Sequence, residues 1–174
     1  GMTAEEIDEV VDAILDVSVA NYNCPGQIVI TGKKESVEEA SKKLQEAGAK
    51  RVVPLNVSGP FHSAMLEEAG EKLADVLEKV TISELQIPYV TNVTAEFVKE
   101  QQKIRSLLAK QISSPVKWQQ SVEAMIAEGV DTFIEIGPGK TLAGFMRKID
   151  RNVKVYNVQM VADIEKVVQE CSRK

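Results

Sequence analysis

The sequence predicts an α/β fold, and three observations support this prediction. Short segments in which apolar and polar residues alternate, as in strands, are separated by segments with apolar residues at helical spacing. Glycine and proline residues mark turns between them. The chain has 174 residues, 44% of them hydrophobic, which suffices for the core of one ordinary domain or two small ones. Strands that alternate with helices indicate an α/β architecture, with a small α+β part in front.

The first third of the chain predicts a hairpin between two helices. Thr3 followed by Glu6 is a capping box, which begins an amphipathic helix. The Asn-Cys-Pro-Gly sequence at 23–26 is typical of a turn between two strands. Gly48 suits the left-handed cap that ends a helix. The elements expected here are a helix from about residue 4, strands at 17–22 and 27–31, a helix at 36–48, and a strand at 51–55.

The rest of the chain predicts more alternating helices and strands. Pro54 and the Ser-Gly-Pro sequence at 58–60 favour a boundary, so we expect two domains, at 1–56 and 57–174. Pro115 suits the first turn of a helix, and Gly129 suits the end of that helix. The further elements expected are helices at 62–80, 104–111, 115–129, 139–145 and from 163, and strands at 89–93, 132–136 and 153–158.

Charge and cysteine content exclude several classes of function. The 26 acidic residues outnumber the 21 basic ones and give a formal net charge of −5, which disfavours nucleic-acid and anionic-membrane partners. No apolar stretch approaches the roughly 20 residues of a membrane span, and the acidic amino terminus differs from a secretory signal. Cys24 and Cys171 are isolated, so we expect no metal site, no disulfide and a reducing cytoplasmic location.

The segment 134–141 has part of the pattern of a phosphate-binding loop. It reads as a strand, a glycine turn and then Gly-Lys-Thr at the start of a helix. A P-loop requires a glycine where Ile134 stands, and a dinucleotide fingerprint requires one where Leu142 stands. We therefore predict a tight strand-to-helix turn, and neither an ATPase nor a nicotinamide enzyme.

His62 is the only histidine, so any histidine chemistry depends on it. A lone histidine beside an apolar segment is more often structural than catalytic. This one follows a Gly-Pro-Phe turn, from which a side chain can face a cleft. A catalytic histidine needs a nucleophile and an acceptor that orients the ring, and the nucleophile elbow G-x-S-x-G does not occur in the sequence. From these residues alone, both interpretations stay open and the structural one is favoured.

Four blocks taken together resemble the family of malonyl-CoA:acyl carrier protein transacylases, in that family's order and spacing from about residue 3 onward. Each block is weakly specific by itself, but four in register are strongly specific. The blocks are residues 21–32 (NYNCPGQIVITG), residues 57–65 (VSGPFHSAM), Gln111 with residues 114–118 (SPVKW), and residues 135–142 (EIGPGKTL).

The resemblance implies transfer of a malonyl group from coenzyme A to acyl carrier protein, in fatty-acid biosynthesis, through a serine ester. It implies that His62 is the general base and that the main-chain carbonyl of Gln111 orients the imidazole. Arg51 matches a basic position that contacts coenzyme A, and Asn23 lies in a block that lines the cleft. Phe61 matches an aromatic residue that crowds an α-methyl branch and so favours malonyl over methylmalonyl groups. No cofactor is implied, because the coenzyme A thioester is a substrate.

The sequence also departs from the family, because the half with the nucleophilic serine has no counterpart in these residues. The resemblance therefore implies that residues 1–56 are a ferredoxin-like small subdomain without its first strand. Residues 57–174 would be the carboxyl-terminal part of a hydrolase-like acyltransferase domain. We expect a partner, either the missing amino-terminal half or a second copy, and negligible activity without it.

Two other interpretations stay open at this point. One is a non-catalytic module that binds coenzyme A or acyl carrier protein through Arg51 and the turn at Asn23. The other is an unrelated α/β domain, for which His62 and Gln111 would lie far apart.

Overall fold

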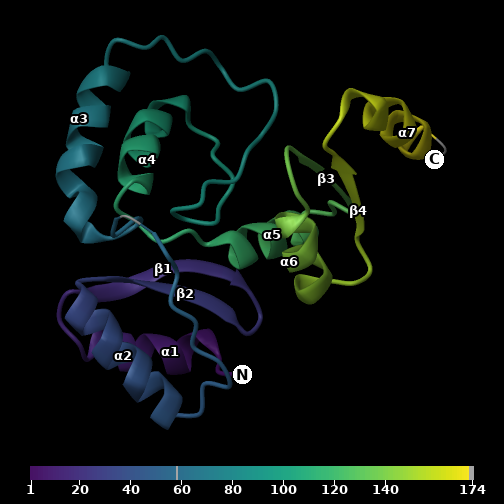
Figure 1. Cartoon of the computed structure of the whole chain (residues 1–174). Coiled ribbons are helices and arrows are strands. Elements are labelled where there is room, and N and C mark those ends of the chain that lie inside the picture. Colours follow the sequence, from purple (N-terminus) through teal and green to yellow (C-terminus); the bar gives the residue numbers. More distant parts are fainter. Residues whose placement is uncertain (58, 173–174) are drawn as a thin grey trace. The chain divides into compact units, whose positions relative to one another are not determined.

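The computed structural model describes residues 1–57 and 59–172, so Ser58 of the predicted histidine block lies outside the described residues. The described part divides into two compact units, Gly1–Ser121 and Val122–Lys174, which are treated separately below. The boundary predicted between residues 56 and 57 stays a prediction. The elements are α1 (Ala4–Asp12), β1 (Val17–Cys24), β2 (Gln27–Gly32), α2 (Lys34–Glu46), η1 (Ala64–Leu66), α3 (Glu67–Leu77), η2 (Gln101–Lys103), α4 (Ile104–Gln111), α5 (Trp118–Ala127), β3 (Thr132–Ile136), α6 (Thr141–Ile149), β4 (Lys154–Val158) and α7 (Val161–Cys171) (Figure 1).

The predicted amino-terminal hairpin and its flanking helices are confirmed. The Thr3 hydroxyl accepts from the backbone N–H of Glu6 at 3.3 Å, and the Glu6 carboxylate accepts from the Thr3 N–H at 2.8 Å, so the capping box forms. β1 and β2 pair antiparallel, and α1 and α2 both pack against them. Gly26 has φ +75°, which a Pro-Gly turn requires at its second central position. The core between helices and hairpin contains Val11, Val19, Ala40 and Leu44.

The segment around Val116 adds to the other edge of β1. The Val116 N–H donates to the carbonyl of Ala20 at 2.8 Å, and the Tyr22 N–H donates to the Val116 carbonyl at 2.9 Å. Asn21 and Val116 thereby form a parallel bridge. Two of the blocks quoted above, distant in sequence, are therefore hydrogen-bonded to each other.

Two predicted strands are wrong. Residues 51–57 have no regular secondary structure, and within residues 89–93 there is only a single bridge, from Val90 to Phe97. A strand exists only through a ladder with a neighbour, and the described chain offers none to residues 51–55. Pro54 also removes a backbone donor from the middle of this segment. The apolar residues therefore stay exposed, as at Val53 and Leu55.

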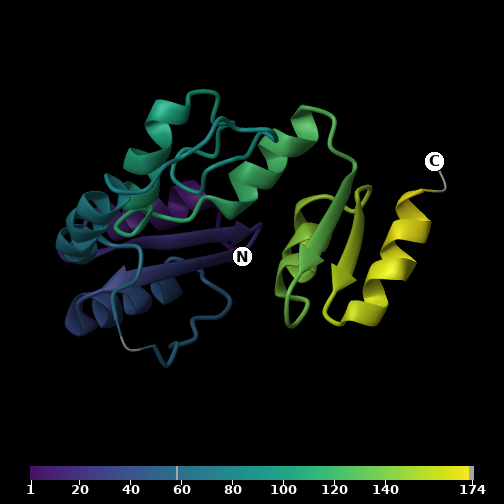
Figure 2. The same cartoon turned by 90° about the horizontal axis from the view of Figure 1, so that it is seen from above.

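Helices α3 and α4 pack against each other in the first unit, and Gln111 is the last residue of α4 (Figure 2). Gly70 is buried in α3, and a Cβ placed on it would lie 2.9 Å from the carbonyl oxygen of Ala109 in α4. Real Cβ atoms do not approach a backbone oxygen so closely, so glycine is what allows this separation of the helices. The end of α4 is thereby held close to α3.

The second unit contains a β-α-β arrangement in which β3 and β4 pair parallel, with α6 between them in sequence. Glu135 on β3 connects the three elements. Its carboxylate accepts from the N–H groups of Leu142 and Ala143 at 3.0 and 2.9 Å, and from the Asn157 side chain at 2.7 Å. A strand carboxylate thus caps the first turn of α6, where negative charge is favourable.

These contacts predict an acid-sensitive step in stability. Partial burial alone would raise the pKa of Glu135, but the three hydrogen bonds outweigh it and the pKa lies below its ordinary value of 4.5. A carboxyl with a lowered pKa in the folded state stabilises fully above that ordinary value, and the stabilisation is lost as the pH falls through the lowered value. We expect Glu135→Gln to have a lower melting temperature than the wild type at neutral pH. Between about pH 5 and pH 3, roughly the range in which carboxyl groups titrate, the melting temperature of Glu135→Gln should fall less than that of the wild type.

The measurement is thermal unfolding followed by circular dichroism across that pH range. Glu128→Gln is the matched control, because Glu128 is exposed in the turn that directly follows α5. Equal pH dependence in the wild-type and Glu135→Gln chains would contradict this role of Glu135.

In residues 1–57 and 59–172, no helix combines the length and the apolar character that crossing a membrane requires.

Candidate functional site

A short turn at residues 59–63 presents His62. The imidazole is half-buried, and the residue has φ +60°, in the left-handed region that non-glycine residues seldom adopt. Such a conformation costs about 1–3 kcal/mol and persists where surrounding contacts impose it. Strained residues of this kind occur preferentially at functional sites. The backbone at His62 is therefore held in place by its neighbours.

The imidazole is directed at the end of α4. His62 Nδ1 lies 3.1 Å from the main-chain oxygen of Gln111, 49 positions later in the sequence. A carbonyl oxygen can only accept, so Nδ1 carries the proton in this hydrogen bond and Nε2 of the neutral ring is left as the basic nitrogen. This is the tautomer that a histidine needs in order to accept a proton through Nε2.

The position of Gln111 explains why its carbonyl can serve as this acceptor. Gln111 is the last residue of α4. The last four carbonyls of a helix lack an intrahelical partner and carry the negative end of the helix dipole. A donor placed there satisfies the carbonyl, and the partial charge also favours a ring that becomes positive after it accepts a proton.

The other predicted site residues are not hydrogen-bonded to His62 or Gln111 in the part of the chain described here. Phe61 directly precedes His62 and is 53% exposed. Arg51 is exposed at the start of the irregular segment 51–57. Asn23 lies in β1, two positions after Asn21. Asn21 forms a bridge to Val116, which belongs to the block that was quoted together with Gln111. The roles of all five residues stay predictions.

The glycine turn at 137–139 does not have a free phosphate-binding helix end. The N–H groups of Leu142 and Ala143 at the start of α6 already donate to Glu135, and the Gly139 N–H donates to the side chain of Gln159 at 3.2 Å. This agrees with a structural strand-to-helix turn.

Sequence reasoning missed two residues that shape the site. Ser63 is only 4% exposed, and its hydroxyl donates to the carbonyl of Pro60 at 2.7 Å, across the turn that contains His62. Gly70 sets the approach of α3 to the α4 end. A serine after a Gly-Pro turn gives no sign of which acceptor it uses. A glycine inside a helical pattern, however, is a signal of close packing.

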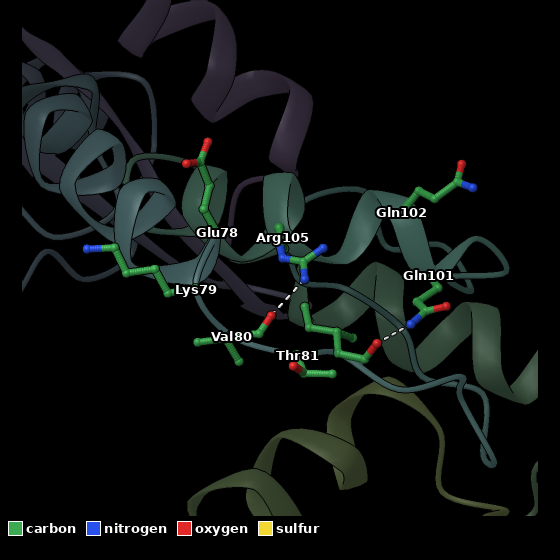
Figure 3. Close-up of a pocket in the computed structure, with 8 residues that line it drawn as sticks. Glu78, Lys79, Val80, Thr81, Gln101, Gln102 and Arg105 are labelled. Atoms are coloured by element: carbon green, nitrogen blue, oxygen red, sulfur yellow. Dashed lines mark hydrogen bonds between the residues drawn. The ribbon is translucent and has the colours of Figure 1, made fainter.

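A cavity of about 360 Å³ lies at the opposite end of the α3–α4 pair and contains none of the predicted site residues (Figure 3). Arg105 of α4 donates through Nε to the carbonyl of Leu77 at 2.9 Å and through Nη2 to that of Val80 at 2.7 Å. The Gln101 side chain donates to the carbonyl of Ile82. These side chains hold the chain as it leaves α3, so the polar groups of this cavity serve the fold.

We therefore expect Arg105→Ala to lower the free energy of unfolding by about 1–2 kcal/mol, because hydrogen bonds of charged groups contribute about 1.5–3 kcal/mol and solvent around this partly exposed guanidinium reduces that contribution. Arg105→Lys should restore less than half of the loss, because an ammonium does not reproduce the fork that reaches two carbonyls. Urea denaturation measures both effects. Lys79→Ala is the control, since Lys79 lines the same cavity with an exposed side chain. An alanine variant of Arg105 as stable as the Lys79 control would refute this role.

Among the described residues, no group of three or more His, Cys, Asp or Glu side chains is arranged to hold a metal ion.

Comparison with known proteins identifies relatives over nearly the whole chain. Residues 1–169 match the family model described as an acyl transferase domain. The malonyl CoA-acyl carrier protein transacylase of Bacillus subtilis (strain 168) is 45% identical over 173 residues, which cover 97% of this chain and 55% of that protein. The protein of the same name from Staphylococcus aureus (strain COL) is 39% identical over 169 residues, or 95% of this chain and 55% of that protein.

Solved structures agree with the sequence relatives. The malonyl CoA-acyl carrier protein transacylase of Clostridium perfringens superposes with a TM-score of 0.92 at 43% identity, over 99% of this chain and 55% of that one. A malonyl-transacylase solved in complex with a type II PKS acyl-carrier protein superposes with a TM-score of 0.93 at 37% identity, over 98% of this chain and 56% of that one. The predicted mixed α/β fold is therefore confirmed. The chain spans about 55% of the length of the curated relatives it matches.

Proposed function

The chain belongs to the family of acyl transferase domains, and we propose that it supplies the histidine part of a malonyl-CoA:acyl carrier protein transacylase. Two relatives that carry this name are 45% and 39% identical to it. The observation that supports the proposal best is the 3.1 Å separation between His62 Nδ1 and the main-chain oxygen of Gln111. A structural histidine has no need of this tautomer, whereas a general base does.

In the first half of the proposed reaction, a serine hydroxyl attacks the thioester carbonyl of malonyl-CoA. His62 accepts the hydroxyl proton at Nε2 while a C–O bond forms. The Gln111 carbonyl keeps the positive ring in place through the Nδ1 proton. The C–S bond then breaks, the coenzyme A thiolate takes the proton back from Nε2, and a malonyl-serine ester remains.

The second half reverses these events with a different thiol. His62 accepts the proton of the carrier protein's phosphopantetheine thiol, and the thiolate attacks the ester. The C–O bond breaks and the serine oxygen takes the proton from Nε2. The malonyl group then forms a thioester with the carrier protein, and the histidine is neutral again.

The remaining predicted residues act on the substrate in this proposal. Arg51 contributes positive charge to the binding of the coenzyme A phosphates. Phe61 is exposed beside His62 and can restrict the space next to the malonyl α-carbon. Asn23 contributes an amide to the lining of the cleft.

The nucleophilic serine comes, in this proposal, from polypeptide that corresponds to the unmatched part of the relatives. Two features of the chain support a need for more polypeptide. Parallel strands are ordinarily covered on both faces, yet Ile136 on β3 is 79% exposed. Along α7, Val161, Ile164 and Val168 form an exposed apolar stripe at helical spacing. We further propose that residues 1–56 form a ferredoxin-like subdomain whose additional strand is supplied in the same way, and that the chain alone has negligible transfer activity.

The test is reconstitution. The 174-residue chain is co-expressed with the segment of the Bacillus subtilis relative that lies outside the match, and the transfer of radiolabelled malonyl from coenzyme A to acyl carrier protein is measured. We expect transfer by the pair and none by either part alone. Thioester or carrier-protein binding without transfer by the pair would instead favour the non-catalytic binding module. Activity of the chain alone would refute the need for a partner.

A further inference from the structure

The turn that presents His62 is held together by one buried hydroxyl. Ser63 follows His62 directly and is 4% exposed, whereas Phe61, just before this pair, and Met65, two positions after it, are 53% and 50% exposed. Its Oγ donates to the carbonyl of Pro60 at 2.7 Å. The hydrogen bond therefore closes a loop that contains Phe61 and His62, and its donor, Ser63, is buried.

Ser63 does not use its hydroxyl in the usual way for its position. It stands at the N-cap of η1 and has the extended backbone of an N-cap residue, with φ −123° and ψ 162°. A serine there ordinarily accepts from an N–H group of the following turn, but Ser63 makes no such side-chain bond. Its hydroxyl is directed backwards, to the residue two positions before His62.

The backbone of His62 depends on this closure. Its φ of +60° is unfavourable for a residue with a Cβ. Pro60 restricts one side of the turn through its ring, and the bond from Ser63 fixes the other side. Because the turn directs the Cα–Cβ bond of His62, a change in it moves the ring relative to the Gln111 oxygen, 3.1 Å from Nδ1.

We propose that Ser63 is a positioning residue for His62: its hydrogen bond to the Pro60 carbonyl keeps the imidazole directed at the Gln111 oxygen, and so keeps Nε2 free to accept a proton. The proposal rests on the function proposed above. Its structural part, the control of the tautomer, can be measured without any transfer assay.

The test uses the fact that His62 is the only histidine. The full chain is labelled with ¹⁵N-histidine, and long-range ¹H–¹⁵N correlation spectra at a pH where the ring is neutral show which nitrogen carries the proton. We expect a protonated Nδ1 in the wild-type chain and a mixture of both tautomers in Ser63→Ala. Ser63→Thr should restore the wild-type spectrum, because it keeps the hydroxyl and suits an extended backbone.

Ser121→Ala is the matched control. Ser121 is 3% exposed, and its hydroxyl also donates to a backbone carbonyl, that of Lys117, at 2.7 Å. It should lower the melting temperature as Ser63→Ala does and leave the tautomer of His62 unchanged. Where Ser63→Ala does not fold, Ser63→Cys keeps the unbranched shape of the side chain with a somewhat larger atom and a weaker donor, and should give the same mixture. An unchanged tautomer in the folded Ser63 variant would overturn the proposal.

Transfer by the reconstituted protein gives the second readout. Groups that orient metal-ligating histidines are typically worth about 10- to 100-fold in activity, and we take a similar factor for the positioning of His62. We expect a decrease of this order in kcat for Ser63→Ala, with KM within about twofold, and recovery in Ser63→Thr. A change confined to KM would overturn the positioning role. If the reconstituted pair shows no transfer at all, the proposed function fails, while the tautomer result for Ser63 still decides the structural claim.

Discussion

Replacing His62 by alanine is expected to lower malonyl transfer by the reconstituted protein on the order of 10³- to 10⁴-fold, the contribution of a positioned general base. The loss should fall on kcat, because the imidazole acts on the proton of the attacking group. Stability should fall by only about 1 kcal/mol, since alanine keeps the Cβ that makes φ +60° unfavourable and removes a single hydrogen bond, the one to the Gln111 oxygen. Steady-state transfer to acyl carrier protein, together with thermal unfolding, separates the two effects.

Gln111→Ala is the informative companion to that variant. The acceptor for His62 is the main-chain oxygen, and alanine keeps a main-chain oxygen at the end of α4. We therefore expect transfer within about threefold of the wild type, since every residue offers the same carbonyl. A loss as large as that of His62→Ala would show that the glutamine side chain does the work, and would contradict the geometry described here.

Gly70→Ala is expected to have the largest effect on the packing that supports the site. An alanine in the middle of a helix ordinarily stabilises by about 1 kcal/mol relative to glycine. At this position the new Cβ would lie 2.9 Å from the Ala109 oxygen, and overpacking against a fixed backbone costs about 1–3 kcal/mol. The steric effect therefore prevails over the gain in helix propensity, and the free energy of unfolding should fall by up to about 2 kcal/mol.

The same substitution should also impair transfer, because Ala109 lies two residues before Gln111 and a shift of α4 moves the oxygen that orients His62. Gly144→Ala is the matched control. Gly144 is also inside a helix, α6, but a Cβ there meets nothing within 4 Å, so this variant should gain about 0.5–1 kcal/mol. Urea denaturation of both variants gives the comparison. Stabilisation of equal size in both would contradict the close α3–α4 packing.

Local signals in the sequence predicted much of the fold. The Thr3 and Glu6 pair specifies its own capping box, and the Pro-Gly pair specifies the turn between β1 and β2, because each depends on residues within a few positions. The strand predicted at 51–55 failed for the opposite reason. Its adjacent valines suit a strand, but a strand needs a partner, and the composition of one segment says nothing about the presence of that partner.

The candidate site divides in the same way. His62 stands out as the only histidine, and the resemblance to a family drew attention to Gln111. No side-chain pattern could have done so, because the group that faces His62 is a backbone carbonyl that every residue has. Ser63 acts through a hydrogen bond to the carbonyl of Pro60. Gly70 acts by allowing a close contact with the backbone of α4. Both depend on how the turn and the helices pack, which local periodicity does not encode.

The most direct test of this account is the protonation pattern of the single imidazole in the wild-type chain. Long-range ¹H–¹⁵N spectra of the neutral ring distinguish its two nitrogens. The account predicts that Nδ1 carries the proton, hydrogen-bonded to the Gln111 oxygen, and that Nε2 is bare. A ring with the proton on Nε2 and a bare Nδ1 would contradict it, because such a histidine could neither bond to that carbonyl nor accept a proton where the reaction requires one.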